Sequence, residues 1–239
     1  MTRDRRYLTP DEIRADFDRI ARHEPQGSSP SFGRYAWIAE QLPPAPARAL
    51  DLGCGTGALT RLLAARYGGA LGVDLSAGML EQALAATPAD CPARFAQGDF
   101  RTTPAPGEKY DVVTAVAALH HLPIDDALAI ATARVAPGGW LFVVDLHDTP
   151  HLPEPLERLA AWSLARWDAL IDPRRVRAEG AREAWLAHGN KERLPSTTEI
   201  KRACTRLEPA GEPRFHVRWR WSLAWRAPQS ACAEPPIRV

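Results

Sequence analysis

A regular alternation of short apolar strands and helices between residues 48 and 146 constrains the fold of this chain more than any other feature. Helices are predicted at 58–67, after Ser76 and at 124–135, so that most strands are separated by a helix. Repeating strand–helix units place parallel strands in one sheet whose two faces are covered by helices. The sequence therefore predicts an α/β fold, a doubly wound and mostly parallel sheet with strands at 48–52, 70–75, 93–97, 110–116 and 140–146.

The segments on either side of this core have a different pattern. Residues 1–46 contain two predicted helices, and the first begins at a capping box of Thr9 and Glu12 with Pro10 at the first helical position. We expect 1–46 to cover the ligand site and 47–150 to form the core. Residues 151–239 then add a helical cap and a C-terminal strand to the same single domain, with helices at 156–171, 173–188 and 197–206.

The C-terminal region contains the clearest period-two pattern in the chain. Apolar residues alternate with polar ones from Phe215 to Trp225, which predicts an antiparallel strand with one polar face. The sheet needs one more strand beside it. That strand is either hidden in the weak pattern of 203–213, or 215–225 breaks into two strands.

Composition excludes several classes of protein. The 239 residues are 45% hydrophobic and 25% charged, with a net charge of +1, which argues against a strongly basic nucleic-acid binder. No apolar run approaches the roughly 20 residues that a membrane span requires. The four cysteines are widely spaced and form no CxxC pair, which disfavours a zinc site or a disulfide framework. We expect a cytoplasmic protein with no nucleic-acid or membrane partner.

The sharpest motif is the loop that follows the first predicted strand. Gly53, Gly55 and Gly57 allow a loop to pass close to a ligand, and the helix N-terminus after the loop favours a carboxylate or phosphate. Asp51 ends the strand before the loop, where it can meet a cationic amine. Asp74 ends the second strand, where a carboxylate can accept hydrogen bonds from both hydroxyls of a ribose. With Ala58, the loop also fits the looser G-x-G-x-x-A dinucleotide pattern.

Further motifs follow the later strands. Gly98-Asp99-Phe100 follows the third strand and offers an acid and an aromatic face to a purine. The fourth strand leads into Leu119-His120-His121-Leu122, and Pro137-Gly138-Gly139 precedes the fifth. Together, in this order, these motifs resemble those of the class I S-adenosylmethionine-dependent methyltransferases, over residues 48–147. The resemblance implies a Rossmann-like fold. Leu194–Thr197 and Ser222–Pro228 also resemble a subgroup that acts on small molecules.

The resemblance implies a role for each matching position. The glycine loop with Asp51 would hold the methionine part of S-adenosylmethionine, and the backbone near the end of the fourth strand would complete the ammonium pocket. Asp74 would hold the ribose, and Leu75 and Met79 would pack on the adenine. Asp99 would meet the adenine amino group, with Phe100 beside it. Arg34, before the core, is a candidate for the carboxylate. The predicted cofactor-binding residues are Arg34, Asp51, Gly53, Cys54, Gly55, Gly57, Asp74, Leu75, Met79, Gly98, Asp99, Phe100, Ala115 and Val116.

Three histidines at the ligand edge of the sheet are candidate catalytic residues. His120 and His121 follow the fourth strand and His147 follows the fifth. One of them can act as a general base for a hydroxyl or carboxylic acid, because histidine titrates near neutral pH. The alternative is a packed or cofactor-lining histidine that moves no proton. Three candidate ligands in His147-Asp148-x-x-His151 are weak support for a metal, and no metal site is predicted.

These observations predict methyl transfer from S-adenosylmethionine to a small-molecule acceptor, with S-adenosylhomocysteine as product and oxygen slightly favoured over nitrogen or carbon. Tryptophans after residue 150 can form an aromatic lid over a flat acceptor. One alternative is a methyltransferase for RNA or protein, because Arg218 and Arg220 in a basic segment can bind phosphates. Others are a non-catalytic S-adenosylmethionine-binding protein and a nicotinamide dehydrogenase. The acceptor and the oligomeric state stay open.

Overall fold

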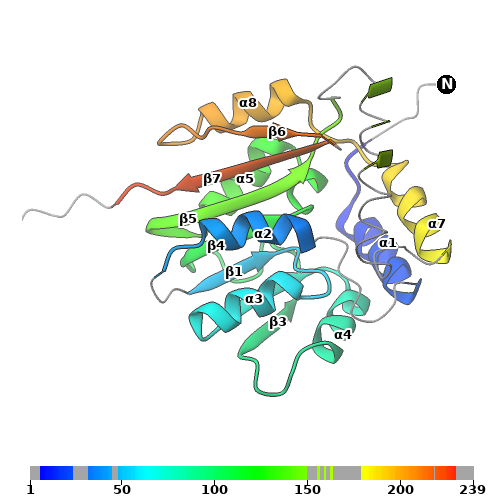
Figure 1. Ribbon diagram of the computed structural model, residues 1–239, viewed down its shortest axis with the longest axis horizontal. Helices are drawn as coiled ribbons and strands as arrows, with labels where there is room; N and C mark the ends of the chain where they lie inside the picture. Colours follow the sequence, from blue (N-terminus) through cyan, green and yellow to red (C-terminus); the bar gives the residue numbers. More distant parts are fainter. Residues whose placement is uncertain are drawn as a thin grey trace, which may run out of the picture.

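Seven strands form one sheet in the order β3-β2-β1-β4-β5-β7-β6 (Figure 1). The structure is a computed structural model that describes residues 6–23, 32–44, 48–149, 155–156, 159, 162–163, 179–217 and 219–229. The first five strands pair in parallel, whereas β7 is antiparallel to β5 and to β6. The predicted α/β fold is confirmed. The strands are β1 (Ala49–Leu52), β2 (Ala70–Asp74), β3 (Ala93–Gln97), β4 (Tyr110–Val116), β5 (Val135–Leu146), β6 (Arg214–His216) and β7 (Arg220–Arg226).

Helices cover both faces of the sheet. On one face, α2 (Phe32–Gln41) and α3 (Ala58–Tyr67) bury Ile38 and Leu63 against β1, β4 and β5. On the other face, α5 (Ile124–Thr132) and α8 (Thr197–Thr205) bury Leu128 and Ile200 in a larger core that includes Trp221 of β7. Burial of β1 on both faces explains why its four residues are buried without alternation.

Two further helices lie beyond the carboxyl ends of the parallel strands (Figure 1). Helix α1 (Pro10–His23) packs against α4 (Ala77–Ala85) and against α7 (Glu179–Gly189). The predicted capping box begins α1, because the Thr9 amide donates to Glu12 Oε2 at 2.9 Å and the Glu12 amide donates to Thr9 Oγ1 at 3.3 Å. Ser76 caps α4 as expected and also donates to Asp18 of α1 at 2.6 Å. These contacts fix α1 above the ends of β1 and β2.

The C-terminal pattern is divided between two strands. The alternation from 215 to 225 is interrupted by a turn in which Trp219 has φ of +53°, and β6 and β7 lie on either side of it. The prediction of one strand over 215–225 is therefore wrong, and its alternative of a break into two strands is confirmed. Ser222 of the expected polar face is only 2% exposed and lies 2.8 Å from His216 Nε2 of β6, whereas Ala224 and Arg226 on the same face of β7 are exposed.

Two other boundaries differ from the predictions. Helix α5 ends at Thr132, and β5 already begins at Val135, so the Pro137–Gly139 turn lies inside β5 where the pairing with β4 shifts register. Helix α7 is described over Glu179–Gly189, which matches the later part of the predicted helix 173–188, whereas 173–178 and most of the predicted helix 156–171 lie outside the described residues. Within the described part, none of the helices combines the length and the apolar character that crossing a membrane requires.

Candidate active site

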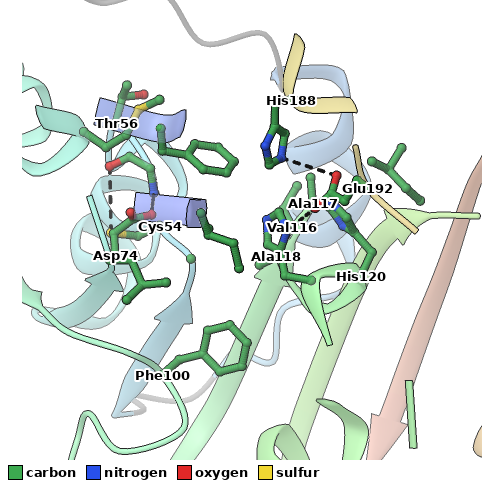
Figure 2. Close-up of a pocket in the computed structure, with 18 of the residues that line it drawn as sticks. Cys54, Thr56, Asp74, Phe100, Val116, Ala117, Ala118, His120, His188 and Glu192 are labelled. Atoms are coloured by element: carbon green, nitrogen blue, oxygen red, sulfur yellow. Dashed lines mark hydrogen bonds and ion pairs between the residues drawn. The ribbon is translucent and has the colours of Figure 1, made fainter. Parts of the chain in front are cut away.

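A pocket of about 280 Å³ lies at the carboxyl ends of β1, β2, β4 and β5, beneath α1 and α7 (Figure 2). This edge of a doubly wound sheet, where the strand order reverses between β1 and β4, is where such folds bind ligands. The lining residues are Ile13, Phe17, Tyr35, Gly53, Cys54, Gly55, Thr56, Asp74, Leu75, Met79, Phe100, Val116, Ala117, Ala118, His120, His121, Leu146, Trp185, His188, Gly189, Glu192 and Arg220.

The glycine loop needs its glycines for two different reasons. Gly53 has φ of +66°, and a Cβ there would lie 2.5 Å from Ala118 Cβ, so the loop packs directly on the segment after β4. Gly57 is equally confined, with a Cβ position 2.6 Å from the Phe95 ring. Gly55 has φ of +53°, but a Cβ there would meet nothing within 4 Å. The space next to the Gly55 Cα is therefore open, and a ligand in the pocket can approach the backbone there.

Asp74 connects the glycine loop to β2 and lines the pocket. Its carboxylate accepts hydrogen bonds from the Gly55 amide at 2.8 Å and the Ser76 amide at 2.9 Å. Burial raises the pKa of this carboxyl group, although the amides partly oppose the shift. Leu75, Met79 and Phe100 are apolar residues that line the same pocket. The predicted ribose and adenine residues on β2, α4 and after β3 thus meet on one side of the pocket.

Other predicted cofactor residues do not line the pocket. Asp51 is 2% exposed and accepts from the Thr60 and Thr114 hydroxyls, each at 2.8 Å. Burial raises the pKa of Asp51 to about 6, despite these hydroxyls. Asp99 accepts from Arg101 Nε at 2.7 Å and so pairs within its own loop. Gly57, Gly98 and Ala115 are likewise not among the lining residues, and the side chain of Arg34 is outside the described residues.

Histidines and carboxylates form the opposite side of the pocket (Figure 2). His120 and His121 lie in the short helix η1 (Leu119–His121) that follows β4. His120 Nδ1 donates to Asp145 Oδ1 at 2.5 Å, and its Nε2 lies 3.5 Å from Glu192 Oε2. His121 Nδ1 contacts Glu192 Oε1. Two of the three predicted catalytic histidines therefore share one carboxylate, which comes from the segment after α7.

The pKa values of these two histidines are shifted in opposite directions. Burial alone would lower the pKa of His120, but the Asp145 and Glu192 carboxylates outweigh it and raise the pKa to about 10. Burial and the charge on His120 lower the pKa of His121. Glu192 and Asp145 have lowered pKa values, because the histidine charges outweigh burial. The cluster thus holds charged carboxylates in a buried position.

His147, the third predicted catalytic histidine, is placed differently. It is fully buried, its Nε2 donates to the Arg220 carbonyl at 3.1 Å, and its ring packs on Phe215. His147 does not line the pocket, and the structure does not bring it together with the other two. His151, its partner in the weak metal motif, lies outside the described residues.

The cap contributes site residues that the sequence interpretation did not identify. Glu192 and His188 come from α7 and the segment after it, and His188 Nδ1 donates to Asp16 Oδ2 of α1 at 3.1 Å. Glu192 lies beyond the end of α7 at Gly189, so the four-residue spacing of His188 and Glu192 is not a helical-face signal that sequence reasoning could have used. Asp145, the second-last residue of β5, also has the strand-end position of a site residue. Among the predicted lid tryptophans, Trp185 lines the pocket and Trp162 is 58% exposed.

Comparisons with known proteins agree with this geometry. A family model described as a methyltransferase domain matches residues 49–139. An uncharacterized methyltransferase of Mycobacterium tuberculosis is 34% identical over 182 residues, which cover 75% of this chain and 86% of that protein. The chain belongs to the class I S-adenosylmethionine-dependent methyltransferases. A trans-aconitate 2-methyltransferase of Methylobacterium nodulans is 44% identical over 118 residues, 48% of this chain and 43% of that protein.

Solved structures show the same methyltransferase fold. An S-adenosylmethionine-dependent methyltransferase from Mesorhizobium loti superposes with a TM-score of 0.55 at 18% identity, covering 84% of this chain and all of that one. The pocket also fits the cofactor of this methyltransferase family. Gly55 leaves open space beside it, the Asp74 carboxylate can accept hydroxyl donors, and Leu75, Met79 and Phe100 supply apolar surface for a purine.

Proposed function

We propose that this methyltransferase acts on a small-molecule acceptor, with an oxygen nucleophile favoured, that binds between the cofactor side of the pocket and α7. The observation that carries the proposal is the closure of the pocket by α1 and α7. Phe17 and Trp185 from these helices meet edge to face with ring centroids 5.6 Å apart, and both line the pocket. An aromatic cover of this kind suits a compact acceptor and excludes water.

The cofactor side has a limited chemical task. When bound, S-adenosylmethionine supplies a methyl group that its sulfonium has already activated. The chain must bind and orient the reactants, which accounts for most of the catalytic requirement. We assign ribose binding to Asp74 and contact with the purine to Leu75, Met79 and Phe100. The open side of Gly55 and the adjoining Cys54 and Thr56 are assigned to the methionine part.

The acceptor side combines apolar cover with polar groups. Ile13, Phe17 and Trp185 provide the apolar surface, and the imidazoles of His120 and His121 can hydrogen-bond an acceptor hydroxyl or carboxyl group. The name of the trans-aconitate relative supports a small carboxylic acid as one acceptor class to test. The RNA alternative receives no such support, because Arg220 lines the pocket and Arg218 is outside the described residues.

The test combines cofactor binding with an acceptor screen. Calorimetry with S-adenosylhomocysteine measures the cofactor side, and mass spectrometry detects methylated products from a panel of small carboxylic acids, phenols and amines. Methylated oxygen products would support the proposal, whereas methylation of RNA or protein alone would contradict it.

A pair of tryptophan variants separates the two sides of the pocket. Trp185→Ala should raise KM for the acceptor about tenfold or more, equivalent to about 1.4 kcal/mol of lost contact. Affinity for S-adenosylhomocysteine should stay within about twofold. Trp162→Ala, at an exposed tryptophan, is the matched control. Equal effects of both substitutions on KM would contradict the proposal that Trp185 contacts the acceptor.

A further inference from the structure

We propose that His120, His121 and Glu192 bind a divalent transition-metal ion, such as Zn²⁺, at the acceptor side of the pocket. One ligand atom from each side chain can be chosen so that all three atoms lie within 4.8 Å of one another. The three residues are 3%, 8% and 4% exposed, and all three line the pocket. The proposal concerns a binding site, and metal binding itself does not depend on the identity of the acceptor.

One pair of donors already has the spacing of tetrahedral coordination. Zinc binds imidazole nitrogen at about 2.0–2.1 Å and carboxylate oxygen at about 2.0–2.2 Å, so two ligand atoms on one zinc lie roughly 3.3–3.5 Å apart. His120 Nε2 and Glu192 Oε2 are 3.5 Å apart. His121 Nδ1 contacts the other oxygen of the same carboxylate. The proposal requires His121 and Glu192 to move apart, so that the three donors, which lie within 4.8 Å of one another, surround one ion.

Outer carboxylates hold the ligands as they do in known metal sites. A histidine that binds a metal usually donates its other ring N–H to a carboxylate, which fixes the tautomer and the ring orientation. Asp145 accepts this bond from His120 Nδ1 at 2.5 Å and also accepts the Leu119 amide at 2.7 Å. His120 is therefore held with Nε2 directed at Glu192.

A second outer pair holds Glu192 from the cap side. His188 Nε2 lies 3.3 Å from Glu192 Oε2, and His188 Nδ1 bonds Asp16 Oδ2 at 3.1 Å. Lys191 also donates to Asp16 at 3.0 Å. The chain Asp16–His188–Glu192 thus orients the carboxylate that the ion would share with the two histidines.

The donor set determines the class of metal and its use. Two imidazoles and one carboxylate suit zinc, cobalt, nickel or iron, whereas magnesium and calcium prefer oxygen ligands alone. Three protein ligands leave a coordination position open, as in catalytic zinc sites. Because the three ligands line the pocket, that position faces the acceptor. The ion would bind an acceptor oxygen and lower the pKa of its hydroxyl group, a role that rests on the proposed function.

The experiment uses full-length enzyme from which any affinity tag has been removed. Elemental analysis measures the metal content as purified. After treatment with a chelator, the protein is titrated with Co²⁺, whose visible absorption reports its coordination by the protein, and with Zn²⁺ by calorimetry and thermal shift. We expect one equivalent of metal per chain, a Co²⁺ spectrum that Zn²⁺ abolishes, and a higher melting temperature with Zn²⁺ but not with Mg²⁺.

Variants locate the ion within the cluster. His121→Asn and Glu192→Gln should each lower the Zn²⁺ affinity at least a hundredfold, and Asp145→Asn should lower it about 10–100-fold through His120. His23→Ala, at an exposed histidine of α1, is the matched control and should change nothing. Retained binding of S-adenosylhomocysteine shows that each variant is folded.

Two results would overturn the proposal. One is wild-type enzyme with less than about a tenth of an equivalent of metal and no Co²⁺ spectrum after titration, which would leave a metal-free network of histidines and carboxylates. The other is Zn²⁺ binding that His121→Asn and Glu192→Gln leave intact, which would place the ion elsewhere. Either result can occur while the enzyme still methylates a small acceptor, so failure here is distinct from failure of the proposed function.

Discussion

The two sides of the pocket are built in different ways. The side assigned to the cofactor comes mainly from one stretch, residues 53–79, in which positive φ angles shape the loop and the Asp74 carboxylate accepts a hydrogen bond from the Gly55 amide. The acceptor side joins side chains that are far apart in the sequence, such as Asp16 and His188, which are separated by 172 residues. The first side depends on backbone geometry, whereas the second depends on buried pairs that exist only when α1 and α7 are docked.

The largest effect is expected at the glycine loop. Gly53→Ala should lower the free energy of unfolding by about 2–5 kcal/mol, because a positive φ costs roughly 1–2 kcal/mol and overpacking adds about 1–3 kcal/mol. Gly55→Ala has the positive φ but no clash, so its loss should be about 1–2 kcal/mol. Urea unfolding measures both. Equal losses would show that contact with Ala118 is not what confines Gly53.

The next prediction asks whether the buried carboxylate of Asp51, in the strand before the glycine loop, lowers the stability of the fold when it is charged. Its pKa is about 6 in the folded protein and near 3.8 when unfolded. The free energy of unfolding should therefore fall by about 3 kcal/mol as the pH rises from about 3 to 7, because the folded state keeps the proton longer. Asp51→Asn should remove this fall and be more stable at pH 7. Urea unfolding curves at several pH values measure this fall. If the free energies of unfolding of the wild type and of Asp51→Asn changed in parallel with pH, the prediction would be contradicted.

The next comparison is between Asp74 and Asp99, two acids that the motifs both predict to bind the cofactor. Asp74→Ala should weaken S-adenosylhomocysteine binding by about 1–3 kcal/mol, since unmade hydrogen bonds to a charged group cost that amount. It also leaves the Gly55 and Ser76 amides without their acceptor. Asp99→Ala should have less effect, because Asp99 pairs with Arg101. Calorimetry measures both, and a larger loss for Asp99→Ala would reverse the assignment.

The smallest effect is expected where the cap is held. Asp16 is buried and bonds His188 and Lys191, but Lys191 is half exposed and solvent screens that part. Asp16→Asn should cost about 1 kcal/mol and speed hydrogen exchange in α7 while β1 amides stay protected. Asp11→Asn, which affects an exposed pair with Arg14, is the control and should leave exchange unchanged. If the α7 amides exchanged at the same rate in Asp16→Asn and in Asp11→Asn, Asp16 would not hold α7.

Local signals predicted the sheet and the helix after the glycine loop well. The strands at 93–97 and 110–116 and the helix at 58–67 match β3, β4 and α3 residue for residue. Apolar runs, capping residues and glycines act within one element, so their pattern can be interpreted without the fold. The break between β6 and β7 gave no such signal, because the apolar alternation continues through the turn at 217–219.

The acceptor side could be predicted only in part. His120 and His121 were identifiable because they follow a buried strand at the ligand edge. Glu192, which pairs with both, comes from a segment whose own pattern indicates only a helix end. His147 shows the converse, since a strand-end position did not bring its side chain into the pocket.

The sequence by itself determined the order of strands and helices, the glycine loop and the identity of the acid that ends β2, because these follow from backbone preferences and burial along a continuous stretch. Only the tertiary structure decided that Asp51 faces two threonines and that Asp16, Asp145 and Glu192 gather around three histidines. The physical reason is that a buried charge is stable only beside a partner, and the docking of distant elements selects that partner.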